Sequence, residues 1–172
     1  MGIDAGSALR TERQIIVGVA SLEVSNDPET VLVTYALGSC LGIAVYDPVV
    51  HVGGLAHVML PDSGIENNRK SNNTPAKYIN TGVPLLFKKM YELGAQKQRI
   101  RNAVIGGAQV VDDNNYFNIG KRNVTALRKL YWKNNVLIHK KHVGGRVNRT
   151  VRLQVSTGRI TVKLGSGEIL EL

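Results

Sequence analysis

A lone cysteine between two glycines carries the sharpest chemical signal in this sequence. It is Cys40, in the segment Gly38-Ser39-Cys40-Leu41-Gly42. Glycine permits tight backbone geometry and the close approach of a ligand, whereas a structural cysteine usually lies within an apolar run. Free cysteines are most often inert core residues, so this setting alone makes a nucleophilic thiol a candidate that needs a partner.

A predicted β-hairpin brings a histidine to this cysteine. The turn is expected at residues 47–50, Asp-Pro-Val-Val, where proline fixes the φ that a tight turn requires. A hairpin folded about the Pro48–Val49 bond places Cys40 directly opposite His57. Because only the thiolate attacks well, a neighbouring imidazole that takes the proton is the partner that a nucleophilic cysteine requires. Gly54 is a candidate substrate-binding position, since its missing side chain leaves room beside the pair.

A third group must orient the imidazole of such a pair. Thr34, on the preceding predicted strand, offers either its hydroxyl or its main-chain carbonyl to His57, and of the two we favour the carbonyl. The backbone N–H groups around Gly38, Ser39 and Cys40 are candidates for an oxyanion hole.

Strands must supply most of the framework around these residues. Apolar and β-branched segments, separated by turns rich in Gly, Pro, Asn and Asp, predict strands along most of the chain. These strands span residues 14–24, 31–37, 41–46, 51–60, 99–105, 136–140, 150–156 and 160–164. Their order, mostly that of hairpins, indicates an α+β fold built as a layered sandwich of mostly antiparallel or mixed sheet.

Two main helices are expected to pack on this sheet. The first has Thr74 as its cap, Pro75 at its first position and Gly94 at its end, with apolar residues at helical spacing between them. The second has Asn118 as its cap.

The composition indicates one globular domain and excludes several classes of protein. The 172 residues are 43% hydrophobic and 20% charged, which excludes intrinsic disorder. No apolar run is long enough to span a membrane, and residues 1–11 lack the apolar region of a secretory signal. A single cysteine forms neither an intramolecular disulfide nor a multi-cysteine zinc site. We expect a reduced, cytoplasmic protein with a flexible arm at 1–13, one domain at 14–172, and neither metal nor cofactor.

The net charge of +9 is unevenly distributed. Residues 1–86 carry a net charge of −3, and residues 87–172 carry +12. Such asymmetry is typical of a surface that binds an acidic partner or a nucleic acid, and equally of a merely solvated face. His139 and His142 belong to this basic half and, like His51, are weaker catalytic candidates than His57.

Several segments together resemble the CheD family of chemoreceptor glutamine deamidases. The specific part is the combined Thr–Cys–His spacing in residues 34–40, Thr-Tyr-Ala-Leu-Gly-Ser-Cys, and 53–61, Gly-Gly-Leu-Ala-His-Val-Met-Leu-Pro. The resemblance runs from about Ile15 to the C-terminus. Further matches are Asp47-Pro48, Ala76-Lys77-Tyr78, Gly106-Gly107-Ala108, Asn118-Ile119-Gly120-Lys121-Arg122-Asn123, Gly144-Gly145 and Arg149.

This resemblance implies a cysteine-hydrolase architecture with a catalytic triad of Cys40, His57 and Thr34. It also implies an activity: hydrolysis of glutamine side chains on methyl-accepting chemotaxis receptors, which yields glutamate that can then be methylated. The implied partners are the cytoplasmic helices of the receptor and, in many members, a CheC-type phosphatase. No cofactor, nucleic acid or membrane insertion is implied, and we expect a monomer.

Two other classes of function compete with this hypothesis. The chain would be a non-catalytic regulator of a CheC-type phosphatase, or an RNA-binding module, if its basic half were its functional part. A different hydrolase with a nucleophile elbow would need a helix after Cys40, whereas residues 41–46 have the pattern of a strand.

Overall fold

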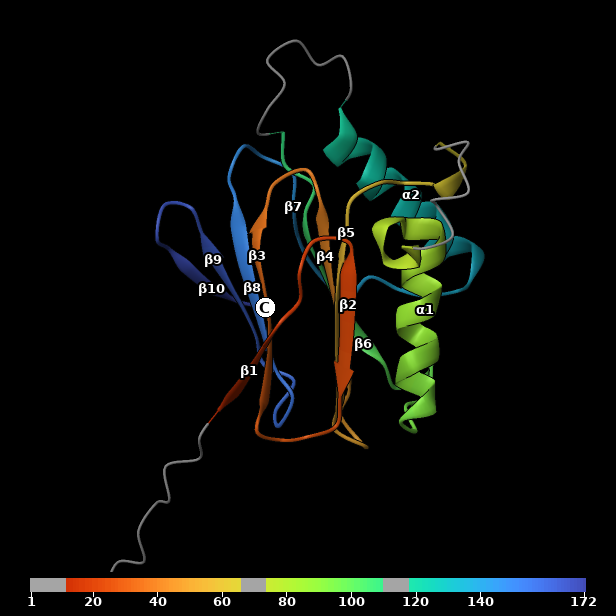
Figure 1. The fold of residues 1–172 in the computed structure, drawn as a ribbon, viewed down its shortest axis with the longest axis vertical. Coiled ribbons are helices and arrows are strands. Elements are labelled where there is room, and N and C mark those ends of the chain that lie inside the picture. The colour runs from red at the N-terminus through yellow and green to blue at the C-terminus, as the bar shows by residue number, and fades with distance from the viewer. Residues whose placement is uncertain (1–11, 66–73, 110–117) are drawn as a thin grey trace, which may run out of the picture.

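The chain folds into three layers, two β-sheets and a pair of helices (Figure 1). A computed structural model describes residues 12–65, 74–109 and 118–172. One layer, here called the outer sheet, has the strand order β1 (Arg13–Ile16), β3 (Thr30–Leu37), β8 (Arg149–Gln154), β9 (Ile160–Leu164) and β10 (Ile169–Glu171). The next, the central sheet, has the order β2 (Ser21–Ser25), β5 (Val52–Val58), β4 (Leu41–Asp47), β6 (Arg101–Gly106) and β7 (Lys140–Val143).

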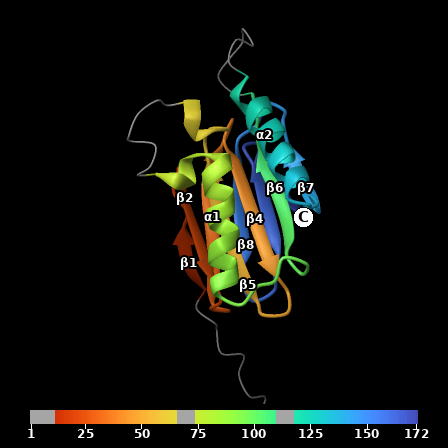
Figure 2. The same ribbon diagram turned by 90° about the vertical axis from the view of Figure 1, so that its right-hand side faces the viewer.

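Two helices, α1 (Ile79–Glu92) and α2 (Ile119–Lys133), cover the face of the central sheet that is turned away from the outer sheet (Figure 2). Short 3₁₀ turns lie at Ser63–Ile65 and Pro75–Lys77. The strand pairs are antiparallel except β1–β3 and β6–β7. This confirms the predicted fold class, a layered α+β sandwich of mostly antiparallel and mixed sheet with two main helices.

The central sheet is buried on both faces, because a layer covers each side. All seven residues of β4, and all seven of β5, are buried. Alternate residues such as Leu41, Ile43 and Val45 join the apolar core beneath the helices, while Ala44 and Leu55 join the core between the sheets. This double burial explains why both strands are almost continuously apolar in sequence.

The strand predictions hold for β3, β4, β5, β6, β8 and β9 to within one or two residues, and fail in three places. The expected strand at 14–24 is two strands, because the chain turns at residues 17–20 to cross from the outer to the central sheet, with Ala20 at φ 56°. The strand expected at 136–140 starts only at Lys140, because Val136 and Ile138 pack against the core beneath the helices. The edge strand β10 was not predicted.

The first helix starts later than its sequence indicates. A 3₁₀ turn at Pro75–Lys77 is followed by Tyr78 in an extended conformation, and α1 begins at Ile79. Tyr78 is extended because it forms a parallel bridge with Leu60. The end of the helix is as predicted, with Gly94 at φ +89° just beyond it. Neither expected cap, Thr74 or Asn118, makes a side-chain capping hydrogen bond.

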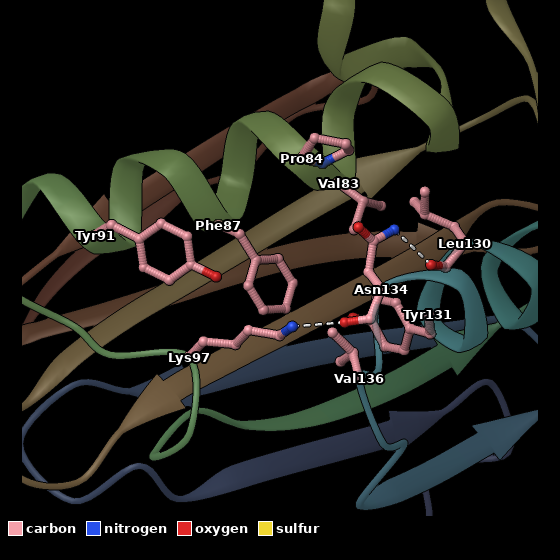
Figure 3. Close-up of a pocket in the computed structure, with 9 residues that line it drawn as sticks. All are labelled: Val83, Pro84, Phe87, Tyr91, Lys97, Leu130, Tyr131, Asn134 and Val136. Carbon is pink, nitrogen blue, oxygen red and sulfur yellow. Dashed lines mark hydrogen bonds between the residues drawn. The ribbon is translucent and has the colours of Figure 1, made fainter.

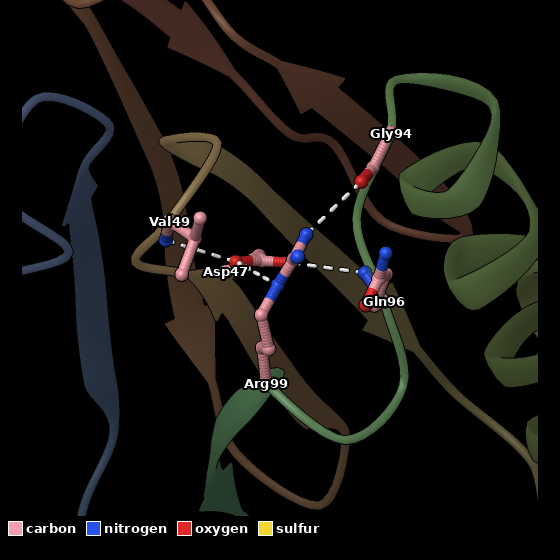
Figure 4. Close-up of polar contacts among 5 residues, drawn as sticks. All are labelled: Asp47, Val49, Gly94, Gln96 and Arg99. Atoms are coloured by element: carbon pink, nitrogen blue, oxygen red, sulfur yellow. Dashed lines mark hydrogen bonds and ion pairs between the residues drawn. The ribbon is translucent and has the colours of Figure 1, made fainter.

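A buried ion pair fastens the β4–β5 turn to the segment that follows α1 (Figure 4). Asp47 is fully buried, and one of its carboxylate oxygens lies 2.9 Å from the guanidinium of Arg99. The backbone N–H groups of Gln96 and Val49 also donate to this carboxylate, each at 2.9 Å. Burial alone would raise the pKa of Asp47, but these hydrogen bonds and the positive charge of Arg99 lower it overall.

Replacing Asp47 by asparagine is expected to lower the free energy of unfolding by about 3 kcal/mol at pH 7, because Arg99 then keeps no buried anion. A carboxyl with a lowered pKa stabilises the fold above its unfolded-state pKa of about 4 and loses that contribution as the pH falls further. The difference between the two proteins in urea denaturation should therefore shrink below pH 4. Glu171→Gln, which breaks the exposed pair with Arg159, is the control and should cost less than about 1 kcal/mol.

Candidate active site

The β4–β5 hairpin places His57 on the expected side of the sheet, but in a different register. His57 lies opposite Gly42, so the predicted pairing of His57 with Cys40 was wrong by two residues. The connection has four unpaired residues, 48–51, whereas the predicted turn left only Pro48 and Val49 unpaired, and its last residue, His51, is in a left-handed conformation at φ 50°. Because the shift is an even number, His57 still faces the layer between the two sheets.

The side chain of Thr34 meets His57 across this layer. Thr34 Oγ1 lies 2.8 Å from His57 Nδ1, and both residues are buried. The contact uses the hydroxyl, so the expectation that the main-chain carbonyl would be the partner is wrong. The ladder between β3 and β8 shifts register between Thr34 and Leu37, so the pairing of β3 changes directly after Thr34.

A backbone carbonyl fixes the direction of this hydrogen bond. The hydroxyl of Thr34 donates its only hydrogen to the carbonyl oxygen of Val17, at 2.8 Å. It can then only accept at its contact with His57, so Nδ1 of the imidazole carries the proton. The other ring nitrogen, Nε2, is left with a free lone pair, which is the form that a general base needs.

Cys40 lies in the β3–β4 connection, where the chain crosses from the outer sheet to the central sheet. In Figure 1 this connection joins the upper ends of strands β3 and β4. The side chain of Cys40 is partly buried against the core between the sheets, which is the layer that His57 faces. His57 Nε2 is buried and has no hydrogen-bond partner among the described residues, the Cys40 thiol included. In apo enzymes such catalytic contacts are often long and shorten when substrate binds.

The peptide groups of this connection are held from one side. The carbonyl oxygens of Gly38 and Cys40 accept hydrogen bonds from the N–H groups of Ala108 and Gly107, each at 2.8 Å. The N–H groups of Ser39 and Cys40 donate to no residue within the described part of the chain. These N–H groups are the oxyanion-hole candidates named from the sequence, and that role stays a prediction.

Burial keeps the cysteine–histidine pair neutral in the free protein. It raises the pKa of the Cys40 thiol above 9.0, an effect that the residue's own backbone N–H partly opposes. It also lowers the pKa of His57 below 6.5. These directions favour a thiol and a neutral imidazole at neutral pH, and a neutral imidazole has a lone pair that can accept a proton.

Other predicted candidates lie elsewhere. Gly54 faces the helices, since a side chain there would meet Leu86 and Met90 of α1, so it is not next to the pair. The remaining three histidines have structural partners. His51 contacts the hydroxyl of Tyr46, His139 contacts Asn102, and His142 accepts from Arg149.

A pocket between α1 and α2 is separate from this site (Figure 3). Phe87 and Tyr131 meet edge to face in it, and the ammonium of Lys97 donates to the carbonyl oxygen of Asn134. It lies on the helix side of the central sheet, whereas His57 faces the other side.

Two contributors to the site were not predicted. The carbonyl of Val17 is a backbone atom, and no residue type signals it. Asn123 of α2 donates from its side-chain amide to the carbonyl oxygens of Ser39 and Met59. Its only signal was its place in the motif at residues 118–123.

These features define an α+β protein with a candidate cysteine–histidine–threonine site between its sheets, and comparison with known proteins identifies its family. Residues 59–164 match the family model described as CheD chemotactic sensory transduction. The chain is 50% identical over 158 residues to a probable chemoreceptor glutamine deamidase CheD 1 of Syntrophus aciditrophicus, covering 92% of this chain and 98% of that protein. A probable chemoreceptor glutamine deamidase CheD of Solibacter usitatus is 47% identical over 147 residues, 86% of each chain. This chain belongs to the CheD family, as its motifs predicted.

Among solved structures, Neisseria meningitidis protein NMB0706 aligns with a TM-score of 0.44 and 9% identity, covering 77% of this chain and 62% of that one. Within the described residues, no helix has the length and apolar character needed to cross a membrane.

The neutral state of the pair predicts how Cys40 reacts with iodoacetamide. Because burial raises the pKa of the thiol, the alkylation rate should be low at pH 7 and still rise between pH 8 and pH 9.5. Mass spectrometry of the intact protein measures this rate, and the same chain unfolded in urea is the control with an ordinary cysteine. A rate that is already constant below pH 7 would show a preformed thiolate–imidazolium pair instead.

Proposed function

We propose that this chain is a chemoreceptor glutamine deamidase, a protein-glutamine glutaminase that converts glutamine side chains to glutamate and releases ammonia. The observation that carries this proposal is the Thr34–His57 hydrogen bond, which leaves Nε2 free as a base on the layer that the only cysteine borders. The printed names of the relatives support the substrate, since both are called probable chemoreceptor glutamine deamidases.

In the first half of the proposed cycle, Cys40 becomes bonded to the substrate. His57 Nε2 takes the thiol proton as sulfur attacks the carboxamide carbon of glutamine. The N–H groups of Ser39 and Cys40 stabilise the negative oxygen of the tetrahedral intermediate. The imidazolium of His57 then returns its proton to the amide nitrogen, the C–N bond breaks, and ammonia leaves behind a thioester.

In the second half, water regenerates the enzyme. Nε2 of His57 removes a proton from the water as its oxygen attacks the thioester carbon. The C–S bond breaks, the thiolate recovers the proton from His57, and the product leaves as glutamate. The cycle uses no oxidant, metal or organic cofactor, and Thr34 holds one ring orientation throughout both halves.

A basic surface beside the site supports docking of the receptor. Residues 119–148 contain eight Lys or Arg, all exposed, and no Asp or Glu. Lys121 and Arg122 of α2 are exposed and directly precede Asn123, which contacts the Cys40 connection. We propose that these cations attract acidic helices of the receptor's cytoplasmic part, with a strength that falls as salt is added.

The cellular setting follows from the same chemistry. One copy of the chain carries every group in the cycle, so we propose that it acts as a monomer. A thiol nucleophile requires a reducing compartment, which favours the cytoplasm. A CheC-type phosphatase is a further proposed partner, on the grounds that many members of the family bind one.

The proposal is tested by mass spectrometry of a receptor cytoplasmic fragment after incubation with the protein. Conversion of glutamine to glutamate exchanges –NH₂ for –OH, so defined peptides should gain about 1 Da in mass. Cys40→Ser and His57→Ala should each abolish the conversion while the circular dichroism spectrum stays that of the wild type. Conversion by either variant would contradict the mechanism.

The role of Thr34 is separately testable. Thr34→Val keeps the shape of the side chain but removes the acceptor for Nδ1–H, so the turnover number should fall by about 10²-fold, by analogy with other orienting hydrogen bonds of catalytic histidines. Thr34→Ser retains the hydroxyl and should keep most of the activity. Equal activity of the two variants would mean that the hydroxyl does not orient His57.

A further inference from the structure

Asn123 bridges two segments that carry the reactive groups. It lies on α2, is fully buried, and donates from Nδ2 to the carbonyl oxygen of Ser39 at 3.0 Å and to that of Met59 at 2.8 Å. Ser39 directly precedes the cysteine, and Met59 follows His57 by two residues. A single amide group thus ties the nucleophile's connection to the end of the strand that holds the base.

The bond to Ser39 sets the direction of the next N–H group. In a trans peptide, the carbonyl of one residue and the N–H of the next point in opposite directions. No cis peptide occurs among the described residues. Because Asn123 holds the Ser39 carbonyl on the α2 side, the N–H of Cys40 points away from α2.

The carbonyl groups of the residues before and after Ser39 are also fixed by hydrogen bonds. Ala108 and Gly107 hold the carbonyls of Gly38 and Cys40. This packing requires glycine: a side chain at Gly106 would meet the carbonyl oxygen of Cys40, and one at Gly120 would lie 2.5 Å from the carbonyl oxygen of Gly107. Of the three consecutive carbonyls, only that of Ser39 is held by a side chain.

The orientation of the amide is chemically determined. Turning it over would place its oxygen against two carbonyl oxygens, so Nδ2 must face Ser39 and Met59. Oδ1 is then buried without a hydrogen-bond partner among the described residues. An apolar side chain would remove this unpaired oxygen but would leave the carbonyl oxygens of Ser39 and Met59 without their donor, so the donor function of Asn123 is what the position requires.

We propose that Asn123 is a positioning residue of the deamidation reaction, which aims the Cys40 N–H at the oxyanion of the tetrahedral intermediate. The inference rests on the proposed function. Asn123 touches neither substrate nor thiol, and acts through the Ser39–Cys40 peptide. Its effect should therefore be confined to the step in which negative charge develops on oxygen.

The test compares Asn123→Asp with the wild type in three measurements. The variant keeps the shape but replaces the donor by a group that repels carbonyl oxygens. We expect the turnover number for a receptor fragment to fall by about 10²-fold, with KM changed by less than about twofold. Inhibition by a peptide aldehyde, which forms an oxyanion on attack by Cys40, should weaken in parallel. Alkylation of Cys40 by iodoacetamide forms no oxyanion, so its rate should fall by far less than the turnover number.

Asn102→Ala is the matched control. Asn102 is also buried, donates to a main-chain carbonyl, that of Leu137, and has an unpartnered Oδ1, but it lies on β6 and contacts neither reactive segment. It should lower stability and leave the turnover number unchanged. If Asn123→Asp does not fold, Asn123→Ser, which removes the contacts without adding charge, serves for the same measurements.

Three results would overturn or redirect the inference. An unchanged turnover number in a folded Asn123 variant would overturn it. Loss of alkylation and turnover by the same factor would also overturn it, since Asn123 would then support the connection as a whole. A wild-type protein that deamidates no glutamine would refute the proposed function itself, and this outcome is visible before any variant is made.

Discussion

The chemistry of this site depends on the single hydrogen of one hydroxyl group. Because Thr34 donates that hydrogen to the carbonyl of Val17, it must accept from His57, and the imidazole is restricted to one tautomer. The carbonyl of Val17, in the turn between β1 and β2, thus determines which ring nitrogen of His57 lacks a proton. This turn contributes no ionisable group to the site. Burial also favours the uncharged forms of the Cys40 thiol and the His57 imidazole, because it raises the pKa of the former and lowers that of the latter.

The three-layer arrangement explains how a small domain holds these groups so closely. Thr34 belongs to the outer sheet and His57 to the central sheet, so their contact spans the core between the sheets. Cys40 lies on the connection between the same two sheets. The helices cover the opposite face of the central sheet, and α2 reaches the site only through its first turns, where Asn123 contacts the connection. Each layer thus contributes one element to the site.

The sequence predicted the α+β sandwich, which the structure confirms, because this fold follows from local patterns. It also brought Thr34 and His57 together correctly, while the catalytic roles of Cys40, His57 and Thr34, named from a specific motif, stay predictions. It failed where tertiary structure decides. The hairpin register depended on the left-handed conformation of His51, which is not predictable from the sequence because residues other than glycine rarely adopt it. The choice of hydroxyl over carbonyl depended on where the β1–β2 turn places Val17. The wrong expectation that Gly54 lies beside the pair could have been avoided from the sequence. Residues three apart on a strand, such as Gly54 and His57, lie on opposite faces of the sheet.

The alternation of β5 has a consequence for how such sequences can diverge. Residues added to the connection at 48–51 lie outside the ladder, so they lengthen a surface loop and leave the pairing of β5 unchanged. A single residue gained or lost between Val52 and His57 would instead turn the imidazole toward α1, where Ala56 and Val58 now pack. The length of the turn can therefore vary among relatives. The number of residues between Val52 and His57 can change only by an even number if the histidine is to keep its face of the sheet, even where the residues themselves change.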